Sequence, residues 1–436
     1  MGYNSKPLSA RIDWTLFLLY IVLVSIGIMA VYTAEYNSFS EPFFNMGRSH
    51  MKQIIWFGIS LFLGVIILFT DSKFFYSISY LSYLIGILLL FATFALSSEV
   101  KGSHSFIKFG GYSFQPGELH KIFTALALAR FISSSETNFK TLKERLQASA
   151  IILFPTLVII LQNETGLALV YFSFFFAMYR EGMPNAIMII AFGAIGLVLS
   201  SLLVESLPLI ISLTALALLA TWILKTQIKR NKIVLVTICS IYLFTILFSQ
   251  VLVPVAFTRV LKGYQVERIY SMFGQDVPIE FRKSGELPKQ DADYNVRQSK
   301  IAIGSGGLKG KGLMKGTQTK GSFVPEQNTD FVFCGIGEQF GFWGSSLLII
   351  LYTTLICKIV VVAERQRSVF SRVYAYSVAG ILFFHFAINL GMTMGLAPVI
   401  GITLPMISYG GTSLLSFSIF MFILIRLDAD RHILIR

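Results

Sequence analysis

About twelve apolar runs, most of them long enough to cross a lipid bilayer as a helix, leave this chain few alternatives to a membrane bundle. A hydrocarbon core about 30 Å thick takes roughly 20 apolar residues in helical form, and unpaired backbone groups confine spanning structures to helices and closed barrels. Of the 436 residues, 55% are hydrophobic and only 14% are charged. The sequence therefore predicts an all-α, polytopic integral membrane bundle. The expected spans lie near residues 13–33, 53–70, 75–96, 118–133, 147–161, 166–180, 185–204, 208–225, 233–256, 331–360, 370–394 and 406–426.

The polar stretches between these runs are too short and too weakly patterned to fold as soluble domains. We therefore expect residues 1–436 to form a single membrane domain. The longest polar stretch, residues 257–330, precedes the last three spans and is expected to be a large loop.

Basic residues predict which side of the membrane each loop faces, because short cytoplasmic loops carry an excess of Lys and Arg. If the N-terminus is cytoplasmic, the loops on that side carry basic residues, whereas the short alternate loops 162–165 and 204–208 carry none. This pattern places both termini inside and the 257–330 loop outside. A net charge of +13 then suits anionic lipid headgroups, and no nucleic acid is expected as a partner.

Residues 298–337 are a glycine-rich and lysine-rich interruption of the apolar pattern, and such a loop is more often functional than connective. Two interpretations are open: backbone N–H groups beside Lys309 and Lys311 cradle phosphate oxygens, or the glycines form a turn packed closely on a neighbouring helix. Nucleotide-binding motifs fail here, because Ser305 and Lys309 stand where glycine is required, and Gly312 where Ser or Thr is required. No nucleotide cofactor is expected.

Charged and polar side chains at or within the spans are candidate functional residues, because such groups are costly in a bilayer. Glu118 and Lys121 lie three residues apart on one helical face, either as an interfacial ion pair or as part of a site. Glu164, between two helix ends, is either a solvated loop carboxylate or a further candidate. His385 and Asn389 are expected to make interhelical hydrogen bonds rather than to bind a metal.

The polar stretch ends in Val-Pro-Glu-Gln-Asn-Thr-Asp-Phe, residues 324–331, directly before an apolar run. Thr329 or Asp330 could cap the N–H groups of the helix start and complement its dipole. Alternatively, a carboxylate held partly desolvated at the membrane surface acquires the raised pKa of a general base. The position permits both roles for Asp330.

Several long motifs follow one another along most of the chain: FGGYSFQPGE, QSKIAIGSGGLKGKGLMKGTQ, PEQNTDFVF followed by GEQFGFWG, and GLAPVIGITLPMISYGGTSLL. In this order they resemble the SEDS family of shape, elongation, division and sporulation proteins. The GKGLMKGTQ motif is more similar to that of the RodA type, which acts in elongation, than to that of the FtsW type, which acts in division. The resemblance implies a peptidoglycan glycosyltransferase that polymerises lipid II into β(1→4)-linked glycan strands during cell-wall elongation and shape maintenance.

The resemblance also implies roles for residues. The family's essential aspartate lies in a TDF motif, here Thr329-Asp330-Phe331, so Asp330 is implied to be catalytic, as general base or as a metal-bound carboxylate. The departing undecaprenyl pyrophosphate needs positive charge, which lysines and a divalent cation, Mg²⁺ or Mn²⁺, could supply. The expected substrate-binding residues are Lys300, Lys309, Lys311, Glu118, Lys121, Glu164 and Glu326.

The chain also departs from the family pattern. Ser105 and Phe106 stand where members often carry Arg-Trp, which removes the basis for a substrate contact there. Members normally have ten spans, and the two additional spans fall within residues 181–256, an apparent two-helix insertion. An even number of added spans preserves the sidedness of everything that follows.

The implied location is the bacterial inner membrane, with the active site on its extracytoplasmic face. The implied partners are a class B penicillin-binding protein transpeptidase and other proteins of the elongation complex. An FtsW-like division polymerase, a lipid II flippase and a noncatalytic scaffold are the alternatives. A carboxylate in an outer loop, rather than at mid-membrane, favours the enzyme.

Overall fold

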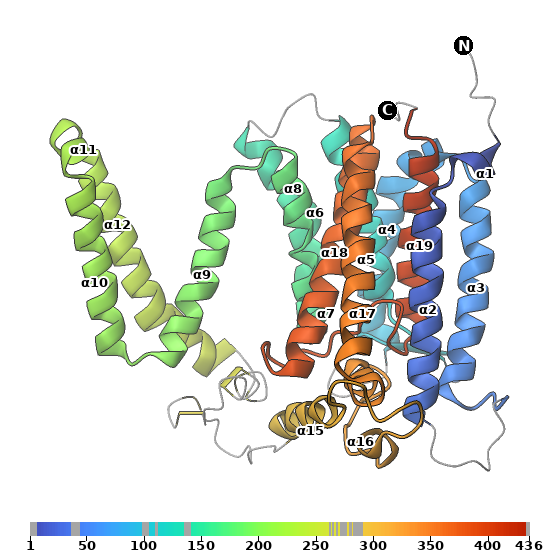
Figure 1. The fold of residues 1–436 in the computed structure, drawn as a ribbon. Coiled ribbons are helices and arrows are strands. Elements are labelled where there is room, and N and C mark those ends of the chain that lie inside the picture. Colours follow the sequence, from blue (N-terminus) through green and yellow to red (C-terminus); the bar gives the residue numbers. More distant parts are fainter. Residues whose placement is uncertain are drawn as a thin grey trace. The chain divides into compact units, whose positions relative to one another are not determined.

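The structure, a computed structural model, describes residues 7–35, 44–97, 104–109, 112–134, 141–260, 263, 266, 269–270, 277–278, 281 and 291–432. Most of these residues are helical, which confirms the predicted all-α membrane fold (Figure 1). The strands β1 (Ile107–Phe109) and β2 (Tyr112–Phe114) form an antiparallel hairpin. The helices before the hairpin are α1 (Leu8–Arg11), α2 (Trp14–Glu35), α3 (Ser49–Phe69) and α4 (Ser72–Leu96).

After the hairpin the chain is again helical. The next helices are α5 (Pro116–Ser134), α6 (Leu142–Leu161), α7 (Thr165–Tyr171), α8 (Phe174–Arg180), α9 (Asn185–Leu203), α10 (Ser206–Ile223), α11 (Lys225–Arg230) and α12 (Ile233–Leu247). They are followed by η1 (Phe248–Leu252), α13 (Val253–Val255), η2 (Ala256–Val260), α15 (Asp291–Ser305), α16 (Thr317–Lys320), α17 (Val332–Glu364), α18 (Val369–Met394) and α19 (Gly411–Ala429).

Ten helices of the described chain are long and apolar enough to cross a membrane, so this is a multi-pass membrane protein. They are α2, α3, α4, α6, α9, α10, the continuous helix Ile233–Arg259 that begins with α12, α17, α18 and α19. Two further segments coincide with the remaining expected spans. These are α5, which carries three charged residues, and the short pair α7 and α8.

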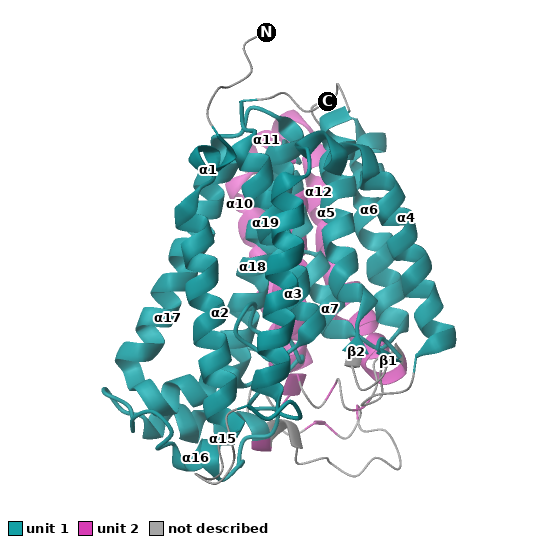
Figure 2. Ribbon diagram, turned by 90° about the vertical axis from the view of Figure 1, so that its right-hand side faces the viewer, with its two compact units in different colours: residues 1–183, 295–436 teal, residues 184–294 magenta. Residues whose placement is uncertain are grey.

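The chain forms two compact units, residues 1–183 with 295–436, and residues 184–294 (Figure 2). In the first unit, α5 packs against α4 and α18, α19 packs against α3, and α17 packs against α2 and α18. α19 is buried along almost its whole length. The functional candidates named above all lie in this first unit.

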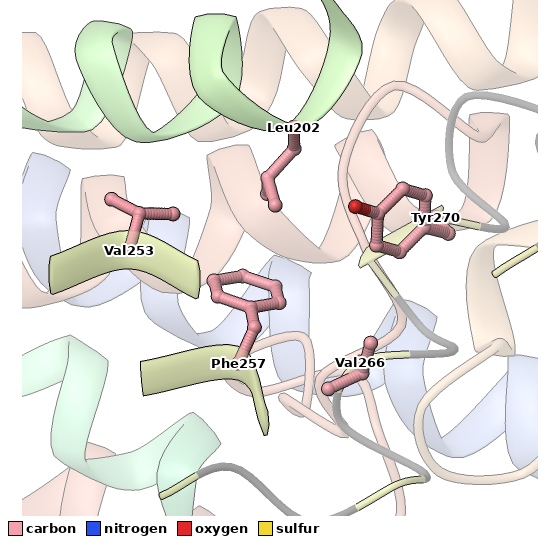
Figure 3. Close-up of a cluster of buried hydrophobic side chains, with 5 residues drawn as sticks. All are labelled: Leu202, Val253, Phe257, Val266 and Tyr270. Atoms are coloured by element: carbon pink, nitrogen blue, oxygen red, sulfur yellow. The ribbon is translucent and has the colours of Figure 1, made fainter. Parts of the chain in front are cut away.

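The second unit contains α9, α10 and α12, with α10 packed against α12. Pro254 has no N–H to donate, and the π-helical turns η1 and η2 flank it, where the α-helical ladder is interrupted. The end of α9 meets this irregular segment in a buried cluster of Leu202, Val253, Phe257, Val266 and Tyr270 (Figure 3). That residues 181–256 are an insertion stays a prediction.

The polar stretch 298–337 has more regular structure than its composition indicates. It begins inside α15, whose residues Val296, Ala302 and Ile303 pack in a cluster with Phe331 at the far end of the stretch. This spacing places the apolar side chains on one helical face, which explains why a glycine-bearing polar segment is helical. Most of residues 261–290, the middle of the expected outer loop, lie outside the described residues.

The glycine-rich turn 306–312 packs directly on the beginning of α17. The N–H groups of Lys311 and Gly312 donate to the carbonyl oxygens of Glu338 and Gln339, each at 3.0 Å. This confirms the glycine-turn interpretation. The two amides are already paired, so they do not form a phosphate cradle.

α17 is broken at Gly341, where φ is 62° and ψ is −156°. The amides beyond the break reach the same turn: Phe342 N donates to Gly307 O at 2.9 Å, and Trp343 N to Leu308 O at 3.3 Å. A Cβ atom on Gly341 would lie 2.3 Å from a backbone nitrogen of the turn, so this position requires glycine.

Candidate functional site

Asp330 lies half-buried directly before α17 and faces the segment that connects α18 to α19. A Cβ atom on Gly401 in that segment would lie 3.3 Å from Oδ2 of Asp330. Gly401 also has a φ of 77°, which favours glycine independently. The N-cap residue of α17 is Phe331, so neither Thr329 nor Asp330 occupies the N-cap position.

Two side chains fix the backbone around Asp330. Asn389 of α18 donates from Nδ2 to the carbonyl oxygen of Asp330 at 2.8 Å and to that of Ile402 at 2.7 Å. The hydroxyl of Ser408 donates to the carbonyl oxygen of Thr329 at 2.5 Å. These two bonds fix the main chain at Thr329 and Asp330. They do not involve the carboxylate of Asp330.

Glu326 shapes the loop that carries Asp330. Its φ is 54°, and its carbonyl oxygen accepts hydrogen bonds from the N–H groups of Thr329 and Phe331, both at 3.1 Å. The hydroxyl of Thr329 donates to its carboxylate at 3.0 Å. These contacts give Glu326 a structural role, and its substrate contact stays a prediction.

The three candidate lysines have different surroundings. Lys300 of α15 and Lys309 of the glycine turn are exposed. Lys311 is engaged: its Nζ donates to Oε1 of Glu338 at 2.8 Å and to the hydroxyl of Thr317 at 2.7 Å. Lys300 and Lys309 are therefore the lysines best exposed for an anionic ligand.

Glu338 holds the polar stretch 298–337 against α17, a role that the sequence did not reveal. Its side chain is fully buried in the first turns of α17, and its carboxylate accepts from the N–H groups of Gln318 and Thr319 at 2.8 and 2.9 Å, besides Lys311. Through these bonds Glu338 connects the polar stretch to α17. The available signal was an acidic residue in GEQFGFWG, within an apolar run.

Glu118 and Lys121 form the predicted ion pair, but the pair is buried inside the bundle rather than placed at the membrane interface. Lys121 Nζ donates to Oε2 of Glu118 at 2.8 Å, and both residues are buried. The same ammonium lies 3.0 Å from Nε2 of His385 and 4.8 Å from the ring centre of Phe417. With no exposed surface, Lys121 acts through these neighbours rather than at an open surface.

The predicted interhelical hydrogen bonding is confirmed for His385, which contacts Lys121 of α5, whereas the bonds of Asn389 go to residues outside the helices. His385 Nδ1 lies 3.1 Å from the carbonyl oxygen of Thr403, and Asn389 bonds Ile402 as described above. Both residues project from α18 onto the same segment.

Glu164 lies near a different part of that segment. Its Oε1 accepts from the hydroxyl of Ser105 at 2.6 Å, and Gln115 Nε2 lies 3.4 Å from the same hydroxyl. Two residues further on, a Cβ atom at Gly166 would lie 2.8 Å from the carbonyl oxygen of Ile400. Ser105, where the family often has another residue, is here the partner of Glu164.

Residues 399–413 therefore connect the candidates. They contact the Asp330 loop, the Glu118–Lys121 pair through His385, and the start of α7 after Glu164. Lys309 and Lys311 lie instead on the glycine turn, against α17 at Glu338, about two helical turns beyond its beginning. The sequence analysis named no candidate site residue in 399–413, although this range lies within the family-like motif GLAPVIGITLPMISYGGTSLL.

The described residues around Asp330 offer few side chains that could bind a divalent cation. Among the described residues, no group of three or more His, Cys, Asp and Glu side chains is placed to hold a metal ion. Mg²⁺ in phosphate-handling sites is usually bound by one or two carboxylates together with substrate phosphates and water. Asp330 fits that simpler arrangement as a single carboxylate.

Comparisons with known proteins agree with this architecture. The family model for cell cycle proteins of the FtsW, RodA and SpoVE group matches residues 13–235 and 210–433. The chain is 30% identical over 424 residues to the peptidoglycan glycosyltransferase RodA of Treponema pallidum, covering 92% of this chain and 94% of the relative. It is 31% identical over 334 residues to the peptidoglycan glycosyltransferase MrdB of Escherichia coli K12, covering 76% and 73%.

A solved structure shares the fold. A chain of a peptidoglycan synthase complex that coordinates polymerization and crosslinking superimposes with a TM-score of 0.65 at 22% identity, over 97% of this chain and 98% of the other. The protein therefore belongs to the FtsW, RodA and SpoVE family of cell cycle proteins, the SEDS family. Within that family it is of the RodA type.

Proposed function

We propose that this protein polymerises lipid II into β(1→4)-linked glycan strands for cell-wall elongation and shape maintenance, with Asp330 as the catalytic residue. The reaction class follows from the family and the named relatives: the protein is a peptidoglycan glycosyltransferase. The observation that supports the site is the setting of Asp330, half-buried before α17, bound through its carbonyl oxygen to Asn389 and resting against Gly401.

In the proposed reaction, the Asp330 carboxylate accepts the proton of the acceptor sugar's 4-hydroxyl while that oxygen attacks the anomeric carbon of a second lipid-linked disaccharide. The bond to undecaprenyl pyrophosphate breaks as the glycosidic bond forms. This single displacement inverts the α linkage of the donor to the β linkage of the product. A positioned general base contributes a factor of roughly 10² to 10⁴ to such a step.

The leaving pyrophosphate is stabilised by positive charge. Lys300 and Lys309 are exposed and supply it directly, whereas Lys311 holds the loop through Glu338. If Asp330 serves instead as a metal-bound carboxylate, it would hold a divalent cation, which would supply further charge stabilisation of the pyrophosphate. Glu118, Lys121, Glu164 and Glu326 act as supports for the segments that form the site.

The positive-inside pattern supports a topology with both termini in the cytoplasm and Asp330 on the outer face of the inner membrane. Lipid II presents its disaccharide on that face. A class B penicillin-binding protein transpeptidase is the proposed partner, together with other proteins of the elongation complex. The similarity of the chain to a component of a peptidoglycan synthase complex supports this pairing.

The decisive experiment is a lipid II polymerisation assay on the full-length protein, reconstituted with its transpeptidase partner. Asp330→Asn should abolish glycan formation while the thermal unfolding midpoint stays near that of the wild type. Asp71→Asn is the matched control, because Asp71 caps α4 and asparagine caps equally well, so its rate should be normal. Normal polymerisation by Asp330→Asn refutes the catalytic assignment, and lipid II flipping without polymerisation in defined liposomes supports the flippase alternative.

A further inference from the structure

Two residues of α18 hold consecutive carbonyl groups of the segment beside Asp330. His385 and Asn389 are one turn apart and both fully or almost fully buried. His385 Nδ1 lies 3.1 Å from the carbonyl oxygen of Thr403, and Asn389 Nδ2 donates to that of Ile402 at 2.7 Å. Residues four positions apart lie on the same face of a helix, so both side chains can reach neighbouring residues of the connecting segment.

The tautomer of His385 follows from its other neighbour. Lys121 Nζ lies 3.0 Å from Nε2, and an ammonium group can only donate hydrogen bonds. Nε2 therefore accepts, the imidazole is neutral, and its proton resides on Nδ1, where it is donated to Thr403. The Glu118–Lys121 ion pair thereby fixes the direction of the hydrogen bond that holds the segment.

Asn389 completes the connection to the carboxylate. Its Nδ2 donates to the carbonyl oxygen of Asp330 at 2.8 Å as well as to Ile402, so one amide group joins the two loops. Between them, Gly401 rests against Oδ2 of Asp330. Asn389 thus fixes the main chain of Asp330, and Gly401 lies beside its carboxylate.

We propose that His385 and Asn389 are positioning residues for Asp330: they fix Ile402 and Thr403, and with them the adjoining Gly401 that lies beside the Asp330 carboxylate. His385 is itself oriented by Lys121. The proposal rests on the proposed catalytic function of Asp330. Neither residue touches substrate. Their contribution comes from geometry, because a displacement of about 1 Å at a reacting group costs up to roughly 100-fold in rate.

The test separates positioning from mere structural support. His385→Phe keeps the ring and removes both hydrogen bonds, and Asn389→Leu keeps the volume and removes both donors. Each should lower kcat for lipid II polymerisation roughly 10- to 100-fold, with KM for lipid II changed by no more than about twofold because substrate contacts are untouched. His385→Gln, which keeps one donor and one acceptor, should recover most of the rate.

Ser377→Ala is the matched control. Ser377 is a fully buried polar residue of the same helix, but its hydroxyl donates only to Val373 O of its own helix, at 2.8 Å. The control should polymerise at the wild-type kcat. If His385→Phe and Asn389→Leu fold and also keep the wild-type kcat, the positioning role is refuted.

A second variant covers the case in which the buried substitutions do not fold. Gly401→Ala leaves the side chains of His385 and Asn389 unchanged and places a methyl group 3.3 Å from Oδ2 of Asp330. Because the φ of 77° also strains an alanine, the unfolding midpoint of this variant is measured beside its kcat. The variant should show the same selective loss of kcat, and a normal kcat overturns the proposal. If wild type and Ser377→Ala both fail to polymerise lipid II, the proposed function itself is at fault.

Discussion

Two lysine–glutamate pairs among the described residues share an Nζ–Oε distance of 2.8 Å but differ in construction. Glu118 and Lys121 are three residues apart on α5, whereas Lys311 and Glu338 join the glycine turn to α17. In the first pair the lysine has no exposed surface; in the second it is the glutamate that has none. In each pair, the fully buried group, Lys121 or Glu338, has further partners besides the opposite charge, because a charge removed from water must be stabilised by the protein.

Those further partners differ in kind. The ammonium of Lys121 is completed by an imidazole nitrogen and an aromatic face, from α18 and α19. The carboxylate of Glu338 is completed by backbone and hydroxyl donors of the Thr317–Thr319 turn. The first pair therefore ties helices together within the bundle, and the second ties a loop to the beginning of a helix.

The comparison predicts that Lys121→Met has the largest effect on stability. It leaves Glu118 buried without a partner, and removing one member of a buried ion pair costs about 3–5 kcal/mol. Thermal unfolding in lipid nanodiscs should report this as a loss for the whole protein. The double variant Glu118→Gln/Lys121→Met should recover most of it, because no unpaired charge remains; equal stability of the single and double variants would contradict this account.

Glu338→Gln should have a smaller and more local effect. The loss of charge-assisted hydrogen bonds costs about 2 kcal/mol, and it should appear as faster hydrogen exchange in residues 311–320 while the global unfolding midpoint changes little. Lys311→Met is the companion variant and should have less effect, since Glu338 keeps its donors from residues 317–319. A global loss as large as that of Lys121→Met would remove the distinction between the two pairs.

Asp13, which lies just before α2 and is paired with Lys358 and Arg365, gives the smallest effect and a pH dependence. Burial alone would raise the pKa of Asp13, but its hydrogen bonds from Arg365 and Lys358 outweigh burial and lower that pKa below its usual 3.8. The stabilisation is therefore complete above pH 3.8 and is lost as the pH falls through the lowered value. Asp13→Asn should destabilise the protein at neutral pH by about 1 kcal/mol.

The measurement for Asp13 is the unfolding midpoint as a function of pH. The difference between wild type and Asp13→Asn should shrink as the solution becomes acidic and vanish below the lowered pKa. A difference that stays constant at all pH values would show that the carboxylate charge is not its source.

Local sequence information predicted the spans and one of the two pairs. Continuous apolar runs are sufficient to define spanning helices, and a three-residue spacing places Glu118 beside Lys121 on any helix. That His385 and Asn389 are hydrogen-bonded was predictable because polar groups within a span must find partners. These inferences need no knowledge of the tertiary structure. That most of the partners of His385 and Asn389 lie in the non-helical segments before α17 and after α18, rather than on another helix, was not predictable.

The remainder of the candidate site depends on contacts between distant residues. Lys311 and Glu338 are separated by 27 residues, and Gly401 lies beside an aspartate from before α17. No periodicity relates such positions. The helix α15 was missed for a related reason: its polar composition concealed an apolar face whose partner, Phe331, lies at the other end of the stretch.

The break at Gly341 has a consequence for how the protein folds. A spanning helix normally satisfies its own backbone and can enter the bilayer as an independent unit. α17 does not, because the amides of Phe342 and Trp343 are paired with carbonyl groups of the preceding glycine turn. The backbone of α17 is therefore fully hydrogen-bonded only when the glycine turn has folded onto it, which couples the folding of the stretch before α17 to that of the helix itself.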